Sequence, residues 1–404
     1  MAMIFGRRKA RDKPTNQVSN APQFLFGKSS SGAYVTPKTA IQMPIVYACV
    51  RVISETIASL PFCVYKESGD GVEKAHEHPL YNVLHNEPNP EMSSFTWRET
   101  VMSHLLLWGN SYNQIIRNGR GDVTGLYPLN PEFMEVDRAN DNSLFYTYTK
   151  TDGTKRILGT HDVLHIPALG FDGIIGYSPI ALEKKAIGLG VAAEEYGSRV
   201  FENNAVPAGI LTHPGVVKDA SRIRDNWHSN YGGSRNAGKV AVLEEGMKFE
   251  AISMPNSEAQ FLETRKFQVA EICRIFRMPP HMVGDLENAT YSNIENQSIN
   301  FGVHTIRPWC VRIEQAMNRS LFKESEKSKY YVSLNMDGLM RGSYKERMEG
   351  YAIARQNGWM STNDIRSLEN MNPVPADEGG DAYLVNGTMI PITTAMNKTN
   401  EGDA

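Results

Sequence analysis

Two charged, amphipathic segments, 178–203 and 257–283, predict a pair of long helices on either side of an insertion, 204–256. In the first segment apolar residues recur at alternating spacings of four and three, which places them in one stripe along a helix. The stripe consists of Leu182, Ala186, Leu189, Ala193, Tyr196 and Val200. Short helices of this kind are marginal alone in water, so the stripe needs a packing partner. Gly188, Gly190 and nearby small residues leave room for another backbone to approach. The layout predicts a two-helix stem that carries a small tip domain.

The composition favours a globular protein with more than one domain. The chain has 404 residues, of which 41% are hydrophobic, enough for several domain-sized cores. A formal net charge of -3 argues against a protein that coats nucleic acid through bulk positive charge. No apolar run approaches the roughly 18 residues that span a bilayer. The four cysteines lie far apart without a CxxC pair, which is typical of buried, reduced thiols and predicts no metal site.

Residues 41–177 predict an α+β domain with a mainly antiparallel sheet. A helix from Pro44 is ended by Pro61, and a second helix covers about 95–108. Alternating apolar segments separated by turn residues then predict a run of hairpins. The expected strands are 112–117, 126–129, 133–137, 145–150, 155–158 and 163–166.

The remaining segments are shorter or less regular. Ser178 and Pro179 predict the start of the first stem helix, and the insertion 204–256 reads as a small αβ module whose strands include Val240–Leu243. A helix kinked near Pro308 and a return strand, Tyr330–Met336, occupy 294–336, and two short helices occupy 337–371. Residues 1–40, with a basic cluster at 7–13, and residues 372–404 are expected to be a flexible arm and a flexible tail.

One motif suggests an enzyme. Residues 233–239 spell GxxxxGK, the pattern of a phosphate-binding loop, but Val240 stands where Ser or Thr would hold Mg²⁺. A helical segment precedes the motif and a strand-like segment follows it, which is the reverse of the order that such a loop requires. A turn into a strand is therefore favoured. No other catalytic constellation and no metal-ligand set is found, so we expect neither an enzyme nor a cofactor.

Several phrases in order along the chain together resemble the HK97-type portal proteins of tailed bacteriophages. They are IVYACVRVISETIASL at 45–60, HPLYNVL at 78–84, HLLLWGNSY at 104–112, LYPLNP at 126–131, GYSP at 176–179, GKVAVLEEG at 238–246, IFRMPP at 275–280 and TYSNIEN at 290–296. Near the end, 358–366 is similar to the family phrase Gly-x-Met-[Ser/Thr]-x-Asn-Glu-x-Arg, with Asp364 in place of Glu. The resemblance spans residues 40–385.

The resemblance implies a portal fold and a ring, a dodecamer in this family, that forms a DNA channel at a unique capsid vertex. Such a ring serves genome packaging with the terminase motor, head-tail joining and DNA ejection. The implied parts are an α+β wing at 41–177 with its kinked helix and return strand at 294–336, stem helices at 178–203 and 257–283, a clip at 204–256, a tunnel loop at 284–293 and a helical crown at 337–371.

Site residues follow from the same resemblance. The stem stripe would pack against copies of itself. The tunnel loop, which offers no cation to grip DNA, would face the channel with Asp285, Glu287, Asn288, Ala289, Thr290, Tyr291, Ser292 and Asn293. The clip would dock partners through Arg222, Arg224, Arg235, Lys239, Glu244 and Glu245.

The partners implied are other copies of the chain, double-stranded DNA passing without sequence preference, the terminase large subunit, the major capsid protein or a scaffold, and a head-tail adaptor. No membrane is expected. The protein would reside in the virion at the portal vertex after assembly in the host cytoplasm. Two alternatives stay open: a packaging NTPase of the P-loop type, and a head adaptor or scaffold without a channel.

Overall fold

The structure is a computed structural model. It describes residues 27–68, 71–202, 209–217, 219–231, 242–243, 246–251, 257–286, 291–336, 344–369 and 371–384. The chain divides into two units, 1–335 and 336–404, which are treated separately below. Within these ranges, every helix is too short or too polar to cross a membrane.

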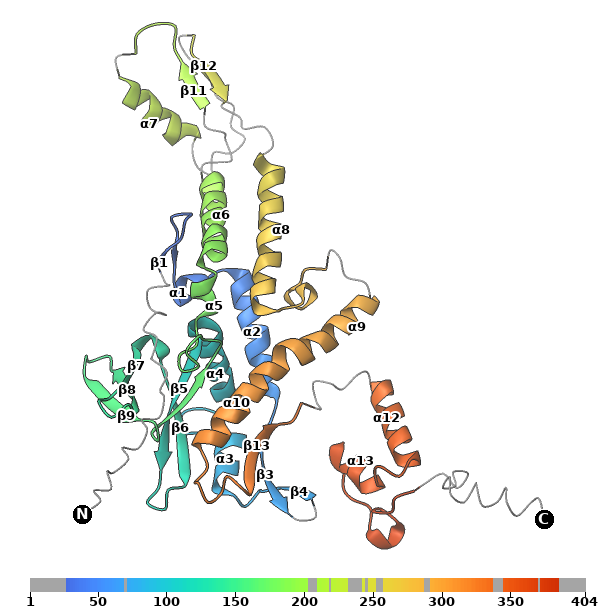
Figure 1. The fold of residues 1–404 in the computed structure, drawn as a ribbon. Helices are drawn as coiled ribbons and strands as arrows, with labels where there is room; N and C mark the ends of the chain where they lie inside the picture. The colour runs from blue at the N-terminus through green and yellow to red at the C-terminus, as the bar shows by residue number, and fades with distance from the viewer. Residues whose placement is uncertain are drawn as a thin grey trace, which may run out of the picture. The chain divides into compact units, whose positions relative to one another are not determined.

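Two helices that lie side by side form the framework of the larger unit (Figure 1). Helix α2 (Pro44–Ser59) begins with a proline in its first turn, where the missing N–H breaks no hydrogen bond, and it ends before Pro61. Helix α4 (Ser94–Trp108) is capped by the Ser93 side chain and ends at Gly109 in the left-handed conformation. Both predicted helices are confirmed.

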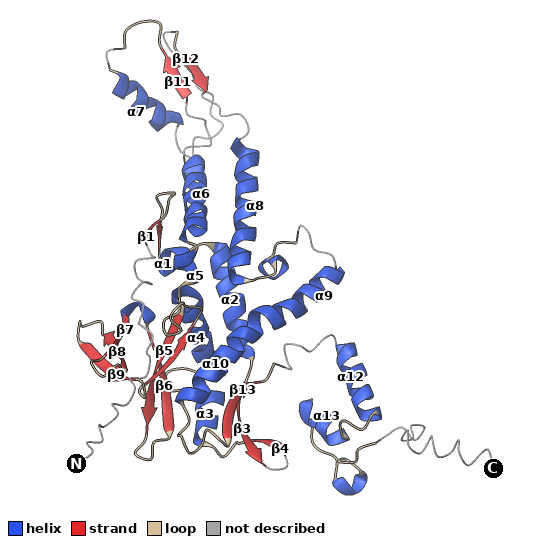
Figure 2. Ribbon diagram, viewed as in Figure 1, coloured by secondary structure: helices blue, strands red, loops and turns tan. Residues whose placement is uncertain are grey.

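Short antiparallel sheets surround this framework (Figure 2). The strands are β3 (Phe62–Ser68), β4 (Gly71–Lys74), β5 (Asn110–Arg117), β6 (Val123–Leu129), β7 (Met134–Arg138), β8 (Leu144–Thr149), β9 (Lys155–Gly159), β10 (Val163–Pro167) and β13 (Tyr330–Leu334). They form the sheets β10–β5–β6, β13–β3–β4 and β7–β8–β9. The predicted hairpins are confirmed where strands adjacent in sequence pair. In contrast, β10 returns to β5, and β13 joins β3. A short helix, α3 (Pro79–His85), contacts β3 and β6.

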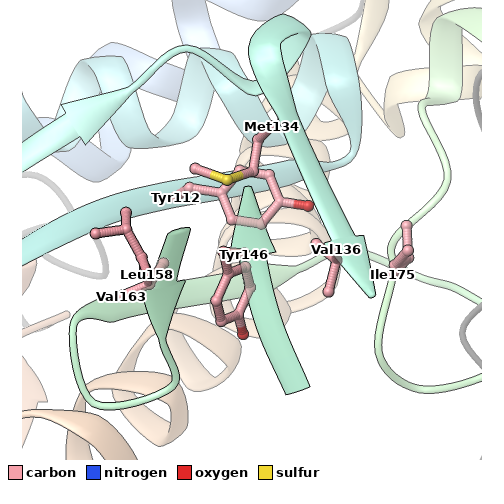
Figure 3. Packing of buried hydrophobic residues seen from close by; sticks show 7 residues of the cluster. All are labelled: Tyr112, Met134, Val136, Tyr146, Leu158, Val163 and Ile175. Carbon is pink, nitrogen blue, oxygen red and sulfur yellow. The ribbon is translucent and has the colours of Figure 1, made fainter. Parts of the chain in front are cut away.

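Two apolar clusters hold these layers together. On α4, Trp97 is fully buried, and its Nε1 donates a hydrogen bond of 2.9 Å to Asn113 Oδ1 on β5. The second cluster joins the β7–β8–β9 sheet to β5 and to the segment after β10 (Figure 3). It consists of Tyr112, Met134, Val136, Tyr146, Leu158, Val163 and Ile175. Alternate residues of β7 therefore face this core, as expected for a half-buried strand.

The predicted stem contains three helices. They are α5 (Pro179–Leu182), α6 (Lys184–Glu202) and α8 (Ser257–Phe276), and α6 lies beside α8 (Figure 1). The predicted start is confirmed, since the Ser178 hydroxyl accepts a hydrogen bond from the Ala181 N–H at 3.2 Å. The single predicted helix is not continuous, because the backbone at Glu183 leaves the helical region with φ -100° and ψ 26°.

The insertion forms a small αβ module as far as it is described. Strands β11 (Gly209–Thr212) and β12 (Lys248–Ala251) pair antiparallel, and α7 (Ala220–Tyr231) accompanies them. The rings of Trp227 on α7 and Phe249 on β12 stack with centroids 5.4 Å apart. The expected strand at 240–243 is not found in its described part, since 242 and 243 have no regular structure.

The predicted kink near Pro308 takes the form of a widened helical turn. The segments are α9 (Tyr291–Asn300), a π-helix (Phe301–Ile306) and α10 (Arg307–Ser320). Pro308 has no N–H, and its ring would collide with the carbonyl of His304 in a regular α-helix. The π-turn before it relieves that collision. The His304 carbonyl instead lies 3.5 Å from Nη1 of Arg277.

Part of the predicted flexible arm, residues 27–40, has regular structure, and residues 1–26 lie outside the described ranges. Residues 27–40 form a two-stranded hairpin of β1 (Gly27–Lys28) and β2 (Tyr34–Val35), followed by α1 (Pro37–Ala40). The Thr36 side chain caps α1, and Val35 and Ala40 are fully buried. These residues belong to the larger unit because buried apolar side chains, which sequence periodicity over so short a stretch does not reveal, hold them there.

The described residues of the smaller unit form two helices, as predicted, and a helical turn. They are α12 (Tyr344–Gln356), α13 (Thr362–Leu368) and η6 (Ala376–Glu378). Ser361 and Asp364 form a reciprocal capping box at the start of α13. Part of the predicted flexible tail is packed here, because Asn363 Nδ2 donates to the Val374 carbonyl at 2.9 Å.

Candidate assembly surface and channel loop

The apolar stripe of the stem lies on the exposed side of the subunit. Leu182 and Leu189 are 49% and 47% exposed, whereas Ile187, which is not in the stripe, is fully buried. Ala186 and Ala193 are half-buried, and the side chains at 196 and 200 lie outside the described residues. The stripe therefore leaves apolar surface that contacts within one chain do not cover.

Two of the small residues of α6, Gly188 and Gly190, leave room for other parts of the same chain and not for a second copy. A Cβ atom at Gly188 would lie 2.3 Å from Oγ of Ser29, and one at Gly190 would lie 2.3 Å from Cε of Met43. Ser31 also donates a hydrogen bond to the Gly188 carbonyl at 2.8 Å. This face of α6 is occupied by the β1–β2 hairpin and the turn before α2.

The inner face of α8 packs on α2. Ile272, Cys273 and Phe276 are buried there. The Cys273 thiol and burial together raise the pKa of Cys49, so Cys49 stays protonated at neutral pH, whereas the same hydrogen bond lowers the pKa of Cys273. All four cysteines are buried and free, as expected. No cluster of metal-ligating side chains occurs among the residues that the structure describes.

A hydrogen-bonded network fixes the segment before the stem to the corner between α4 and β5. Asn110 Oδ1 accepts from the Gly176 N–H at 2.8 Å, and its Nδ2 donates to the Gly176 carbonyl at 2.7 Å. His165 Nε2 lies 3.0 Å from the same Oδ1, and His165 Nδ1 lies 3.4 Å from the Tyr146 hydroxyl. A neutral imidazole that donates at Nε2 and accepts at Nδ1 satisfies this pattern.

Acid is expected to destabilise this network. Burial lowers the pKa of His165 to about 3, with Arg319 also lowering it and Asp172 opposing the shift. Below the ordinary pKa of 6.5 the unfolded chain takes up a proton that the folded chain refuses, so stability falls as pH drops. Each pH unit below that value costs about 1.4 kcal/mol.

The variant His165→Gln should therefore show a shallower loss of unfolding free energy between pH 6 and pH 4 than the wild type, by about 1.4 kcal/mol per unit. Urea denaturation at several pH values measures both slopes. His104, whose pKa burial lowers to about 4, contributes equally to both proteins. Parallel slopes would show that His165 takes up its proton in the folded state as readily as in the unfolded one.

The predicted tunnel loop is shorter than 284–293. A 3-10 turn, Pro280–Val283, ends at Gly284 in the left-handed conformation, with φ +89°. Asp285 and Leu286 follow it, and 287–290 lie outside the described residues, which includes Glu287, Asn288, Ala289 and Thr290. The other three expected residues, Tyr291, Ser292 and Asn293, form the first turn of α9.

The two ends of this loop are tied together. His281 Nδ1, before the loop, lies 2.9 Å from Oε1 of Gln297 on α9. The Asp285 N–H donates to the Pro280 carbonyl at 3.0 Å. Leu286 is exposed. The described residues on the two sides of 287–290 are therefore joined by the contact between His281 and Gln297.

The expected docking residues of the tip are only partly described. Arg222 and Arg224 lie exposed on α7, and the backbone N–H of Arg222 donates to Asp219 at 3.0 Å. Arg224 Nε lies 3.4 Å from Asp225. The residues outside the described ranges are Arg235, Lys239, Glu244 and Glu245, and the GxxxxGK motif lies there too. The structure brings Arg222 and Arg224 onto one helix and does not test the rest.

Sequence reasoning missed the junction between Asn110, His165 and Gly176. It also missed a cavity between α1 and the β7–β8–β9 sheet. The phrase GYSP at 176–179 signalled the junction, because Gly176 tolerates no Cβ: one would lie 2.1 Å from the Gly109 carbonyl oxygen. The cavity has no such signal, since its walls come from elements far apart in sequence.

Comparison with known proteins gives consistent results. A sequence profile of the phage portal protein family matches residues 44–370. The probable portal protein of Streptomyces phage phiC31 is 38% identical over 374 residues, which cover 89% of this chain and 81% of that protein. The portal protein of Enterobacteria phage HK97 is 31% identical over 366 residues, covering 89% and 85%.

Solved structures share the fold. An HK97 family phage portal protein from Corynebacterium diphtheriae matches with a TM-score of 0.57 at 15% identity, covering 76% of this chain and 98% of that one. A chain in the neck of a native gene transfer agent particle, computed with C12 symmetry, matches with a TM-score of 0.57 at 23% identity, covering 85% and 98%. This α+β chain belongs to the phage portal protein family, and its fold is the portal fold.

Proposed function

We propose that copies of this chain form a closed ring, a dodecamer, around an axial channel for double-stranded DNA at one vertex of a phage capsid. The observation that carries the proposal is the exposed apolar stripe of the stem, represented by Leu182 and Leu189. It lies apart from the face that packs on the rest of the chain. A head-to-tail contact between two different surfaces of identical subunits closes into a ring when its rotation divides a full turn.

The physics of a channel agrees with the charges of the subunit. An obligate contact of this kind buries about 2,000 Å² or more, which the stripe alone does not supply, so other surfaces of the larger unit contribute. DNA carries one charge per roughly 1.7 Å, and cations repeated around a ring would retard it. The net charge of -3, and a loop 284–293 without Lys or Arg, suit a passive conduit.

The parts take the roles that their family membership implies. Residues 41–177 with 294–336 act as the wing, α5, α6 and α8 as the stem, the β11–β12 module as the clip, and 337–371 as the crown. The clip docks the terminase large subunit during packaging and a head-tail adaptor afterwards, and the outer wing contacts the major capsid protein or a scaffold. The ring assembles in the host cytoplasm and stays in the virion, where DNA later leaves through it. The subunit itself catalyses nothing.

Substitution of Asn288 by Lys should slow DNA packaging by about tenfold, because the ring would present one new cation per subunit to the passing phosphates. The matched control is Asn140→Lys, which adds the same charge at an exposed turn between β7 and β8. Packaging of labelled DNA into proheads, with purified terminase and ATP, measures the rate. Equal rates for the two variants would remove the assignment of 284–293 to the channel.

A further inference from the structure

A cavity of about 850 Å³ opens beside the β7–β8–β9 sheet. Its walls include Trp108, Tyr112, Met134, Val136 and Ile157, so much of its lining is apolar. Three of these residues belong to the cluster of Figure 3. Ile157, on β9, is 72% exposed, and it pairs across the sheet with Thr147, the partner of Glu135. These residues and Phe145 of the cavity lining therefore share the face of the sheet opposite to the buried Met134 and Val136. An exposed large apolar side chain beside Phe145 on this outer face indicates an occupant.

The rim of the cavity is acidic. Glu132, Glu135 and Asp137 line it, against Lys155 as a cation. Glu132 forms an ion pair of 2.9 Å with Lys38. Glu135 and Asp137 are exposed on β7, and neither forms an ion pair with a Lys or Arg side chain in the described part of the chain, although Asp137 Oδ1 accepts from the backbone N–H of Arg138 at 2.7 Å. The occupant is therefore expected to combine apolar groups with positive charge.

The start of the described chain lies at this rim. Gly27 of β1 is the partner of Val35 in the hairpin, and the next two residues, Thr36 and Pro37, line the cavity. Partner residues of antiparallel strands have Cα atoms about 5 Å apart. The segment before Gly27 is therefore attached within a few ångströms of the opening.

That segment has the required chemistry. Residues 24–26 are Phe-Leu-Phe, directly before Gly27, and residues 7–13 hold five cations, Arg7, Arg8, Lys9, Arg11 and Lys13, against one acid, Asp12. When extended, the 14 residues 13–26 reach up to about 46 Å. The basic cluster can therefore reach the acidic rim from the attachment at Gly27.

We propose that residues 1–26 dock into the cavity of their own chain, with the Phe-Leu-Phe segment against Phe145 and Ile157 and the basic cluster over the acidic rim. The attachment at Gly27 makes docking intramolecular, so the local concentration of the segment far exceeds that of the same segment on a neighbouring copy. The larger unit would thereby cover Ile157 without a partner protein. This inference does not depend on the ring.

A photo-crosslinker tests the proposal in the full-length protein. With p-benzoylphenylalanine in place of Leu25, irradiation should attach position 25 to the cavity wall, at Phe145 or Ile157, as mapped by mass spectrometry. Mixed ¹⁴N and ¹⁵N subunits identify the origin of the segment. Adducts within one isotope support the proposal. Adducts elsewhere, no adducts, or isotopically mixed adducts at the statistical share would overturn it.

The charge of the rim provides a second readout. The double variant Glu135→Lys with Asp137→Lys should lower the yield of cavity adducts at least fivefold. Its control, Glu73→Lys with Glu91→Lys, makes the same charge change at two exposed residues outside the cavity wall and should leave the yield unchanged. Equal yields would show that the basic cluster does not dock on this rim. Circular dichroism confirms that each protein is folded before irradiation.

Discussion

Replacement of Leu189 by Lys is expected to leave the subunit folded and to prevent ring assembly. Leu189 is 47% exposed in a single chain, so a lysine there can extend into water and the fold loses little. In the proposed ring the stripe would be covered, and an ammonium group without a partner there would cost about 2 kcal/mol or more at each contact. That is about thirty-fold in affinity per contact, repeated at each interface around the ring.

Light scattering after gel filtration and electron microscopy of the purified protein measure the assembly, and circular dichroism measures the fold. The matched control is Val72→Lys on β4, an apolar residue 55% exposed on an edge strand away from the stem. Rings should form with this variant as with the wild type. If Leu189→Lys forms rings as readily as Val72→Lys, the stripe is not an assembly surface.

Local patterns account for the parts of the fold that the sequence predicted. The strands of the β5–β6 hairpin and the β7–β8–β9 sheet alternate and are joined by turn residues, so a short window contains the information. The partner of β10 is different. It is β5, more than forty residues earlier, and no local pattern distinguishes that pairing from one with β9. Sequence reasoning therefore found the strands and missed their order.

The stem shows why a stripe predicts packing without identifying the partner. The spacing of Leu182 and Leu189 predicted an apolar stripe on one helix, but Leu182 belongs to α5 and Leu189 to α6, so the stripe is divided between two helices. The spacing did not show that Ile187 and Gly188 form a second face that packs within the chain, because one buried Ile and one Gly give no periodic signal. Both faces need a packing partner. Only the structure shows that the face of Ile187 and Gly188 packs within the chain, whereas the face of Leu182 and Leu189 does not.

The candidate channel loop was located from the resemblance and only bounded by the structure. Its base is described, from the 3-10 turn before Gly284 to the contact between His281 and Gln297. The assignment of its tip to the channel stays a prediction. Which residues of a loop face a shared axis depends on the arrangement of several copies, and a single sequence holds no local signal for that.

Replacement of Gly109 by Ala is expected to destabilise the larger unit much more than the replacement of Gly153 by Ala, which adds the same methyl group. Gly109 ends α4 with φ +76°, and its carbonyl accepts from the Ala168 N–H at 2.8 Å. A Cβ atom there would lie 2.3 Å from the carbonyl carbon and oxygen of Tyr177. These are backbone atoms held by the Asn110 network, so they cannot rotate away. The start of the stem, where Ser178 caps α5, would have to move away from Gly109.

The control separates the clash from the backbone conformation. Gly153, in the turn between β8 and β9, has φ +81° and no atom within 4 Å of an added Cβ. Gly153→Ala should cost about 1 kcal/mol from the left-handed conformation alone. Gly109→Ala should cost at least about 3 kcal/mol, by the same strain plus overpacking. Urea denaturation followed by far-ultraviolet circular dichroism measures both. Equal losses of unfolding free energy for the two variants would mean that the backbone between α4 and β5 shifts at little cost. The close approach of Gly109 to Tyr177 would then not fix the position of the stem.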